Sequence, residues 1–345
     1  MKDSITLAFL GDVMLGRGVN EEIPHRSPES FWGSVLPILQ GADAAIANLE
    51  CAITHQSSEE CCRTAKVFHF RADPAAVDVL RAGNIQFVSL ANNHTLDFGD
   101  RGLLDTLHHL DAAGIRHAGA GRNLHEAATP VLLDVAGLKV GFISLTDNEP
   151  AFAAGWDRLG TRYLPIRSDR ATLSLIETAV EQLRAAGATL VVLSVHWGPN
   201  MVTAPLPQFR HFAHAVVDCG VDLIHGHSAH LFQGVESYKR GLILYDTGDF
   251  LDDYAVDPVL RNDRSFAFLV EADALGLQRL RTIPVRLHYA QVDLAKDEEF
   301  AAICQRMRSL CMAFNTQVQQ TSEGLEVNLQ QSLEITANSM DLKRS

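Results

Sequence analysis

Short apolar runs alternate with longer amphipathic patterns along most of the chain. Uninterrupted apolar runs are typical of buried strands, and they occur at residues 5–10, 44–47, 85–90, 131–135, 139–145, 190–195, 222–224, 242–245 and 265–271. Helical patterns, several of them delimited by proline or glycine, occur at residues 73–82, 102–113, 168–186, 207–219 and 300–314. Asp73 and Pro74 predict the N-cap and first position of one helix. The alternation predicts an α/β fold, and the polar residues after Gln319 predict a loose tail.

The charge balance argues against several classes of partner. Of the 345 residues, 42 are Asp or Glu and 29 are Lys or Arg, so the formal net charge is −13. A chain this acidic, with no basic run, lacks the electrostatic footprint of a nucleic-acid-binding protein. It can still bind a small anionic substrate where metal ions supply positive charge locally.

The remaining composition points to an intracellular protein. No apolar run is long enough to span a membrane, and the first run, residues 5–10, is too short for a signal peptide. We therefore expect a cytoplasmic protein. The six cysteines lie at irregular spacings, which favours reduced thiols over a disulfide framework.

Five segments place carboxylate, amide or imidazole side chains directly after predicted strands: Gly11–Arg17, Asn48–Glu50, Asn92–Gly99, His196–Gly198 and Gly226–His230. Open α/β sheets bind ligands at the carboxyl ends of their strands. A mixture of carboxylate oxygen and imidazole nitrogen suits zinc, manganese or iron. The residues themselves therefore predict a metal site at strand ends.

Each of these residues also has a structural explanation. Asp12 can cap a turn, Glu50 can be a solvated strand end, and Asn92 and Asn93 can form a turn pair. His196 alone can be a core histidine. The three histidines at positions 225, 227 and 230 favour metal binding more strongly because they cluster within six residues.

The ordered set of segments resembles the calcineurin-like metallophosphoesterase superfamily. More closely, it resembles the bacterial capsule synthesis family of the CapA or poly-γ-glutamate biosynthesis type. Residues 119–121 (Gly-Ala-Gly) and 245–250 (Tyr-Asp-Thr-Gly-Asp-Phe) add to the match, which covers residues 5–290. The resemblance implies a four-layer α-β-β-α sandwich of two mixed β-sheets. Residues 1–290 would form the family domain, 291–320 a helix packing on it, and 321–345 a polar tail.

The resemblance also implies a divalent metal centre of two ions, with manganese, iron or zinc as candidates. Asp12 and His230 would bind one ion, and Glu50 would bridge both. Asn93, His196 and His227, which also follow predicted strands, would be the other ligands of the second ion. Capsule or polyglutamate biosynthesis implies a ligase as a possible partner.

The implied reaction is the hydrolysis of a phosphate ester. His94 would act as general acid, with Asp97 orienting its imidazole. Arg17 and Asn92 would contact oxyanions of the substrate. The loop at residues 155–165, which contains Trp156, could govern specificity, or it could be an ordinary surface loop.

The sequence departs from the superfamily pattern at two places. Two residues, not one, separate His227 from His230, a spacing that resembles the capsule synthesis family instead. The usual histidine two residues after the first aspartate is replaced by Met14, whose thioether has little affinity for these cations, and this departure keeps other functions open. One alternative is an accessory protein in capsule or polyglutamate biosynthesis without hydrolysis. Another is a metal-independent isomerase or epimerase in which Asp12 and His94 form an acid–base pair.

Overall fold

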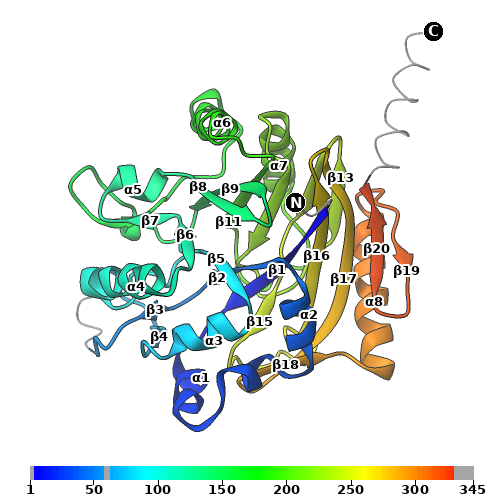
Figure 1. The fold of residues 1–345 in the computed structure, drawn as a ribbon, viewed down its shortest axis with the longest axis horizontal. Helices are drawn as coiled ribbons and strands as arrows, with labels where there is room; N and C mark the ends of the chain where they lie inside the picture. Colours follow the sequence, from blue (N-terminus) through cyan, green and yellow to red (C-terminus); the bar gives the residue numbers. More distant parts are fainter. Residues whose placement is uncertain (1–3, 58–62, 330–345) are drawn as a thin grey trace.

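Strand β1 lies in the middle of the larger of two mixed sheets in the computed structural model, which describes residues 4–57 and 63–329 (Figure 1). The strand order of this sheet is β19-β20-β17-β16-β1-β2-β5-β6, with β15 beside β1 and β18 beside β17. β1 is parallel to β2 and β15 but antiparallel to β16. The bounds are β1 Ser4–Val13, β2 Ala44–Leu49, β5 Ile85–Ser89, β6 Arg116–Ala118, β15 Asp249–Leu251, β16 Arg264–Asp273, β17 Gly276–His288, β18 Gln291–Leu294, β19 Gln319–Gln320 and β20 Leu325–Asn328.

The second sheet has the strand order β13-β14-β12-β11-β9-β8. Its central strands β9, β11, β12 and β14 are parallel, and an antiparallel strand closes each edge. The bounds are β8 Val131–Val135, β9 Leu138–Thr146, β11 Leu190–His196, β12 Leu223–His227, β13 Val235–Tyr238 and β14 Gly241–Leu244. Two small sheets pair β3 with β4 and β7 with β10: β3 Ala52–Ile53, β4 Arg71–Ala72, β7 Ala120–Gly121 and β10 Gly160–Thr161.

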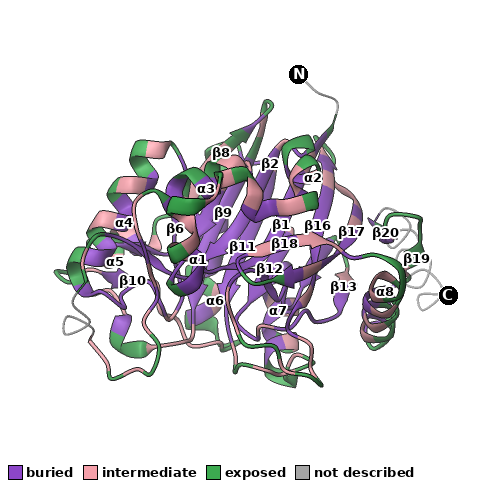
Figure 2. Ribbon diagram, turned by 90° about the horizontal axis from the view of Figure 1, so that it is seen from below, coloured by how far each residue is buried: buried purple, intermediate pink, exposed green. Residues whose placement is uncertain are grey.

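Five helices cover the outer faces of the two sheets, whereas α8 packs against the inner apolar cluster. Alternate side chains of the larger sheet pack in one apolar cluster with helices α2, α3 and α4, and the outer face of the second sheet packs with α6 and α7. Figure 2 shows the strands as buried and the helices as partly exposed. The bounds are α1 Arg17–Glu22, α2 Leu36–Gly41, α3 Ala76–Ala82, α4 Gly99–Ala113, α5 Leu124–Ala128, α6 Arg170–Ala185, α7 Pro207–Asp218 and α8 Asp297–Met312, with 3₁₀ turns at Ile23–His25, Pro28–Val35 and Pro150–Phe152.

The inner faces of the two sheets meet in a third apolar cluster. Phe9 of β1 and Phe87 of β5 belong to it, as do Phe142 of β9 and Leu223 of β12. The rings of Phe87 and Phe142 stack across the two sheets with their centroids 3.9 Å apart. Because successive side chains of a strand point to opposite faces, each central strand contributes to an inner and an outer apolar layer.

The expected α/β class with mixed sheets is confirmed, and most predicted elements lie within a few residues of the observed ones. The helix expected to start at Asp73 begins at Ala76 instead, because Asp73 accepts a hydrogen bond from Arg71 and does not cap the helix. The four described cysteines, 51, 219, 304 and 311, are free; Cys61 and Cys62 lie outside the described residues.

The loose tail expected after Gln319 is wrong for its first part. Leu325–Asn328 form β20, which pairs with β17 and buries Leu325 and Val327 in the inner cluster. β18, which also follows residue 290, pairs with β17, so the larger sheet continues across the expected domain boundary. Residues 330–345 of the expected tail lie outside the described residues.

Replacing Phe142 by alanine should test the apolar layer between the sheets. Removing a large, fully buried ring leaves a cavity, so we expect the free energy of unfolding to fall by about 3–5 kcal/mol. Urea denaturation measures this value. Leu275→Ala is the control, since Leu275 is 91% exposed, and a similar loss in both variants would contradict the packing described.

Candidate functional site

The carboxyl ends of parallel strands from both sheets meet at one place. Asp12 of β1 lies in register with Asn48 of β2 on one side and with Asp249 of β15 on the other. His196 of β11 lies in register with His227 of β12. The two strands β1 and β15 approach closely because Gly11 has no side chain: a Cβ there would lie 1.8 Å from the carbonyl oxygen of Gly248.

A first group of possible metal ligands consists of Asp12, His196 and His227, all buried. The Nδ1 atoms of the two histidines lie 3.0 Å apart, and His227 Nδ1 lies 3.9 Å from Asp12 Oδ1. Four ligand atoms at about 2.1 Å from a tetrahedral ion lie about 3.4 Å from one another. The observed separations therefore fall on both sides of the value that such a centre requires.

A chain of hydrogen bonds between the two sheets determines which nitrogen of His227 is free. His225 Nε2 lies 2.7 Å from the carbonyl oxygen of Leu10, which can only accept, so Nε2 donates. Burial lowers the pKa of His225 to about 4, so its Nδ1 accepts from the Ser194 hydroxyl at 3.2 Å. The Ser194 oxygen then accepts from His227 Nε2 at 3.0 Å. His227 Nδ1 keeps its lone pair, as a metal ligand requires.

A second group of possible ligands consists of Asp12, Glu50 and His230. His230 Nδ1 lies 3.6 Å from Asp12 Oδ2 and 2.7 Å from Asp249 Oδ1. The Tyr254 hydroxyl donates to Glu50 Oε2 at 3.0 Å. Asp12 is thus common to both groups, whereas the resemblance implied Glu50 as the bridging residue. Glu50 also approaches the first group, since its Oε1 lies 3.9 Å from His196 Nε2.

Four buried oxygen atoms of the site have no hydrogen-bond donor within the described chain: Asp12 Oδ2, Glu50 Oε1, Asn93 Oδ1 and Asp249 Oδ2. A buried acceptor without a partner is costly, and a bound cation would satisfy it. The first three of these atoms belong to residues expected to bind metal. The donor set therefore fits a divalent cation.

The pKa shifts at the site follow from burial and crowding. Burial, followed by the neighbouring Glu50 carboxylate, raises the pKa of Asp12 well above its ordinary value. Burial lowers the pKa of His196 and His227 well below theirs, which keeps both imidazoles neutral. Burial also opposes charge on His230, but Asp249 and the nearby carboxylates outweigh it and raise the pKa of His230.

His94 and Asp97 form a second cluster beside these ligands. His94 Nδ1 lies 2.6 Å from Asp97 Oδ2. Lys66 donates to Asp97 Oδ1 at 2.7 Å, and the ring of Phe70 stacks on the imidazole with the centroids 4.1 Å apart. The structure thus brings His94 and Asp97 together as expected. Lys66 and Phe70 carry no sequence signal and were missed.

Asn92 has a different environment from the one expected for a substrate contact. It is fully buried, and its amide donates to Asn48 Oδ1 at 3.0 Å and to the carbonyl oxygen of Leu49 at 2.8 Å. Its own oxygen accepts from the backbone of His94. Asn48 in turn donates to Asp12 Oδ1 at 2.7 Å. This geometry connects the His94 segment to Asp12 and leaves the Asn92 amide inaccessible to a substrate.

Arg17 lies nearer the surface, with 38% of its side chain exposed. Its Nε donates to Asp253 at 3.2 Å, and its guanidinium lies 5.6 Å from the centre of the Phe70 ring and 5.9 Å from that of Tyr254. Both rings contact residues of the site. Arg17 (φ 51°) and His230 (φ 58°) have left-handed backbone conformations, as do several non-glycine residues outside the site.

Other functional candidates were missed or remain unassigned. Asp249 lies within the matched stretch at residues 245–250, which was a usable signal, but no role was attached to it. Met14 is buried, and its sulfur accepts from the backbone of Gly16 at 3.0 Å. In the loop at 155–165, residues 160–161 form β10 and Trp156 is 85% exposed. Its role in specificity remains a prediction.

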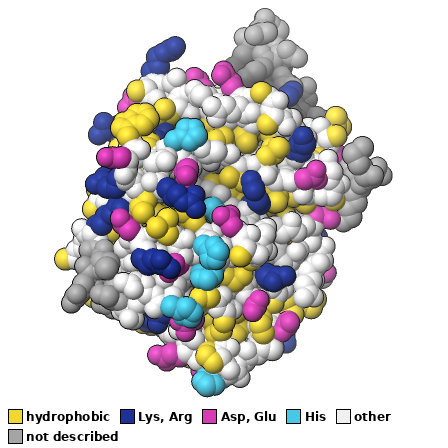
Figure 3. Space-filling model, turned by 60° about the vertical axis from the view of Figure 1, so that its left-hand side comes forward, with side chains coloured by type: hydrophobic (Ala, Val, Ile, Leu, Met, Phe, Trp, Pro, Cys, Tyr) yellow, Lys and Arg dark blue, Asp and Glu magenta, His cyan; other side chains and the backbone are white. Residues whose placement is uncertain are grey.

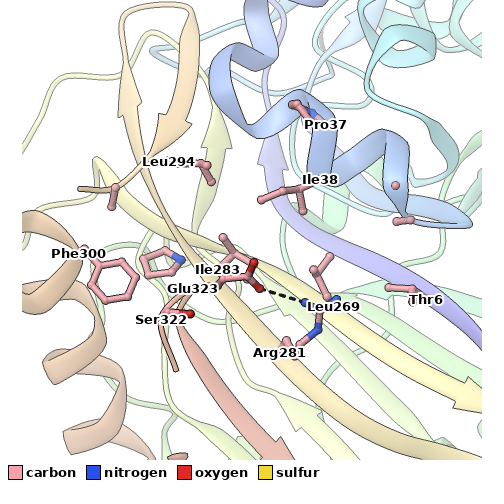
Figure 4. A pocket seen from close by; sticks show the side chains of 14 residues that line it. Thr6, Pro37, Ile38, Leu269, Arg281, Ile283, Leu294, Phe300, Ser322 and Glu323 are labelled. Carbon is pink, nitrogen blue, oxygen red and sulfur yellow. Dashed lines mark hydrogen bonds and ion pairs between the residues drawn. The ribbon is translucent and has the colours of Figure 1, made fainter. Parts of the chain in front are cut away.

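A pocket of about 440 Å³ lies away from this site (Figure 4). Thr6 lines it, and Thr6 stands six residues before Asp12 on β1, which separates the two by about 20 Å along the strand. Most of its other labelled residues are apolar, with Arg281 paired to Glu323.

On the face shown in Figure 3, basic and acidic side chains are interspersed, without a continuous basic track. No helix among the described residues is long and apolar enough to cross a membrane.

Three relatives show where this chain stands among known proteins. Capsule biosynthesis protein CapA of Bacillus anthracis is 30% identical over 254 residues, which cover 73% of this chain and 60% of that protein. A probable polyglutamine synthesis accessory protein of Mycobacterium tuberculosis is 30% identical over 340 residues, which cover 86% of this chain and 88% of that protein. PGA biosynthesis protein CapA of Bacillus subtilis (strain 168) is 29% identical over 290 residues, which cover 84% of this chain and 73% of that protein.

Solved structures are less similar. A hypothetical protein from Thermus thermophilus aligns with a TM-score of 0.47 and 15% identity, covering 81% of this chain and 98% of that chain. NAD nucleotidase of Haemophilus influenzae aligns with a TM-score of 0.45 and 14% identity, covering 89% and 56%. With TM-scores below 0.5, neither likeness bears on the activity of this chain.

The family model described as bacterial capsule synthesis protein PGA_cap matches residues 6–254. This range includes every residue of both ligand groups, as well as His94, Asp97 and Arg17. Because the match extends over most of the chain, the protein belongs to the bacterial capsule synthesis protein family.

Proposed function

We propose that this chain is a metal-dependent hydrolase of phosphate esters that acts on a small anionic substrate in capsule or polyglutamate biosynthesis. The observation that carries the proposal is the pair of ligand groups sharing Asp12, with unsatisfied carboxylate oxygens beside the His94–Asp97 pair. A metal-free acid–base site would not need so many buried acceptors without donors.

The proposed metal ligands are Asp12, Glu50, Asn93, His196, His227 and His230. Divalent cations there would offset the negative charge of the phosphoryl oxygens and lower the pKa of water. Manganese, iron and zinc all suit this mixture of oxygen and nitrogen ligands. Ser194 and His225 orient His227, and Asp249 orients His230.

The chain's own residues supply the remaining steps. His94 donates a proton to the leaving oxygen, and Asp97 holds its ring through Nδ1. Arg17, held by Asp253 and two aromatic rings, binds an oxyanion of the substrate. Asn92 positions the His94 segment rather than touching the substrate, because its amide is buried and fully engaged.

A second candidate is an accessory role beside a capsule or polyglutamate ligase. The Mycobacterium tuberculosis relative carries the name of a synthesis accessory protein, which favours this role. The two candidates differ in turnover: metal binding without hydrolysis of any phosphate ester, together with a stable ligase complex in a pulldown, would support the accessory role.

Replacing His227 by alanine should lower the metal content of the purified protein. The variant removes one of three ligands in the first group, so we expect fewer Mn, Fe or Zn ions per chain by elemental analysis. His108→Ala is a suitable control, because His108 is exposed on α4. Unchanged metal content would remove His227 from the ligand set, and a metal-free wild type would instead favour the isomerase alternative.

Replacing Ser194 by alanine should weaken metal binding without removing a ligand. Loss of the hydroxyl frees His227 Nε2 from its acceptor, and changes of this kind cost about 10- to 100-fold in metal affinity. Titration calorimetry with Mn²⁺ measures the dissociation constant. Ser174→Ala, on the exposed face of α6, should bind as the wild type does; equal affinity in both variants would refute the orienting role.

Replacing His94 by alanine should reduce kcat by about 10²- to 10⁴-fold while the metal content stays the same. The measurement is hydrolysis of phosphate monoesters and diesters under several divalent ions, combined with elemental analysis. Loss of metal together with activity would point to a ligand role for His94. Unchanged turnover would rule out its role as the acid.

A further inference from the structure

Lys66 is a largely buried cation that belongs to none of the five polar segments. Only 12% of its side chain is exposed. Its ammonium group donates to Asp97 Oδ1 at 2.7 Å and to the carbonyl oxygen of Asn93. One side chain thus connects the carboxylate that holds His94 to the backbone of a proposed metal ligand.

The contacts of Asp97 determine which ring nitrogen of His94 carries the proton. Asp97 Oδ2 accepts from the backbone N–H of Phe70 at 2.8 Å, and Oδ1 accepts from Lys66. Both oxygens of Asp97 are thus acceptors in these contacts, and we assign Oδ2 as the acceptor from His94 too, so that Nδ1 donates to it at 2.6 Å. Lys66 Nζ lies 3.2 Å from the same Nδ1; since both carry protons, this is a contact between two donors.

The imidazole of His94 is therefore enclosed on one face and one edge. Phe70 covers the face, with an interplanar angle of 26°. Asp97 and Lys66 occupy the Nδ1 edge. The remaining nitrogen is Nε2, to which the structure assigns no partner within the described chain. Any proton that His94 exchanges with a substrate passes through this atom.

We propose that Lys66 is a positioning residue that holds Asp97 and Asn93 in place, so that His94 keeps its proton on Nδ1 and transfers protons through Nε2. The inference rests on the proposed role of His94 as general acid. It adds a residue from outside the sequence motifs to the site. It also states the tautomer of the neutral ring that remains after the Nε2 proton has gone to the leaving group, before Nε2 takes up another proton from water.

The first test reads the tautomer directly and needs no activity. Protonated and unprotonated imidazole nitrogens have different ¹⁵N chemical shifts, and His94→Ala identifies the His94 signals in spectra of the ¹⁵N-histidine-labelled full chain. We expect the neutral ring of the wild type to carry its proton on Nδ1. In Lys66→Met the signals should move toward a mixture of tautomers, and Lys66→Arg should largely restore them. Lys139→Met is the control, since the Lys139 ammonium group donates to the carbonyl oxygen of Ala186 at the end of α6.

The second test uses the leaving group. In the Mn²⁺-loaded protein, Lys66→Met should lower kcat on phenyl phosphate by about 10- to 100-fold. It should change kcat on p-nitrophenyl phosphate by less than about threefold, since that leaving group needs little protonation. Lys66→Met should also lower the unfolding midpoint, because the buried Asp97 carboxylate loses its ion-pair partner. The comparison of the two esters separates this loss of stability from the effect on proton transfer. His94→Ala should show the same preference for the better leaving group.

Three results would overturn the inference: a proton on Nε2 in the wild-type neutral ring, unchanged His94 signals in Lys66→Met, or equal losses on both esters. Equal losses would mean that Lys66 acts only through general stability. A wild-type protein that hydrolyses neither ester would contradict the proposed function instead. The ¹⁵N spectra would then still decide whether Lys66 sets the tautomer of His94.

Discussion

The burial of the Asp12 carboxylate at the junction of two sheets is the constraint on which the site depends. It is completely buried, it lies near Glu50 and Asp249, and one of its oxygens has no donor within the described chain. A single charge in such surroundings costs several kcal/mol unless it is compensated. Asn48 compensates part of that cost from the protein, and the nearby imidazoles of His196 and His227 stay neutral. His230, whose pKa the surrounding carboxylates raise, offsets a further part of the cost, and the Asp12 oxygen that has no donor is left for the proposed cation.

Hydrogen-bonded relays connect this point to the rest of the fold. Through Ser194 and His225, the orientation of His227 is tied to the backbone of β1 at Leu10. Through Asn48 and Asn92, Asp12 is tied to the segment that carries His94. Because each relay crosses between strands, the positions of the ligands follow from sheet register and the inner apolar layer. The polar side chains at the strand ends are therefore held in place by the packing of the core.

The sequence predicted the strands and helices that have simple periodicity, and the residues that come directly after them. β17 was missed because Pro284 interrupts it and arginines at 279, 281 and 286 occupy its more exposed positions, a pattern unlike a buried strand. Lys66 and Ser194 were missed for another reason. Their roles depend on side chains that are distant in the chain, and nothing local distinguishes them from ordinary surface or core residues.

The close approach of β15 to β1 at Gly11 also limits how this chain can vary. Even a methyl group at position 11 would collide with the backbone of Gly248 and push the two strands apart. That displacement would carry Asp249 away from His230, whose ring it holds. An apolar change with no charge or hydrogen bond of its own would thus misalign an imidazole in the loop that follows β12. How large a side chain the protein accepts at position 11 therefore shows how much displacement of Asp249 and His230 the site can accommodate.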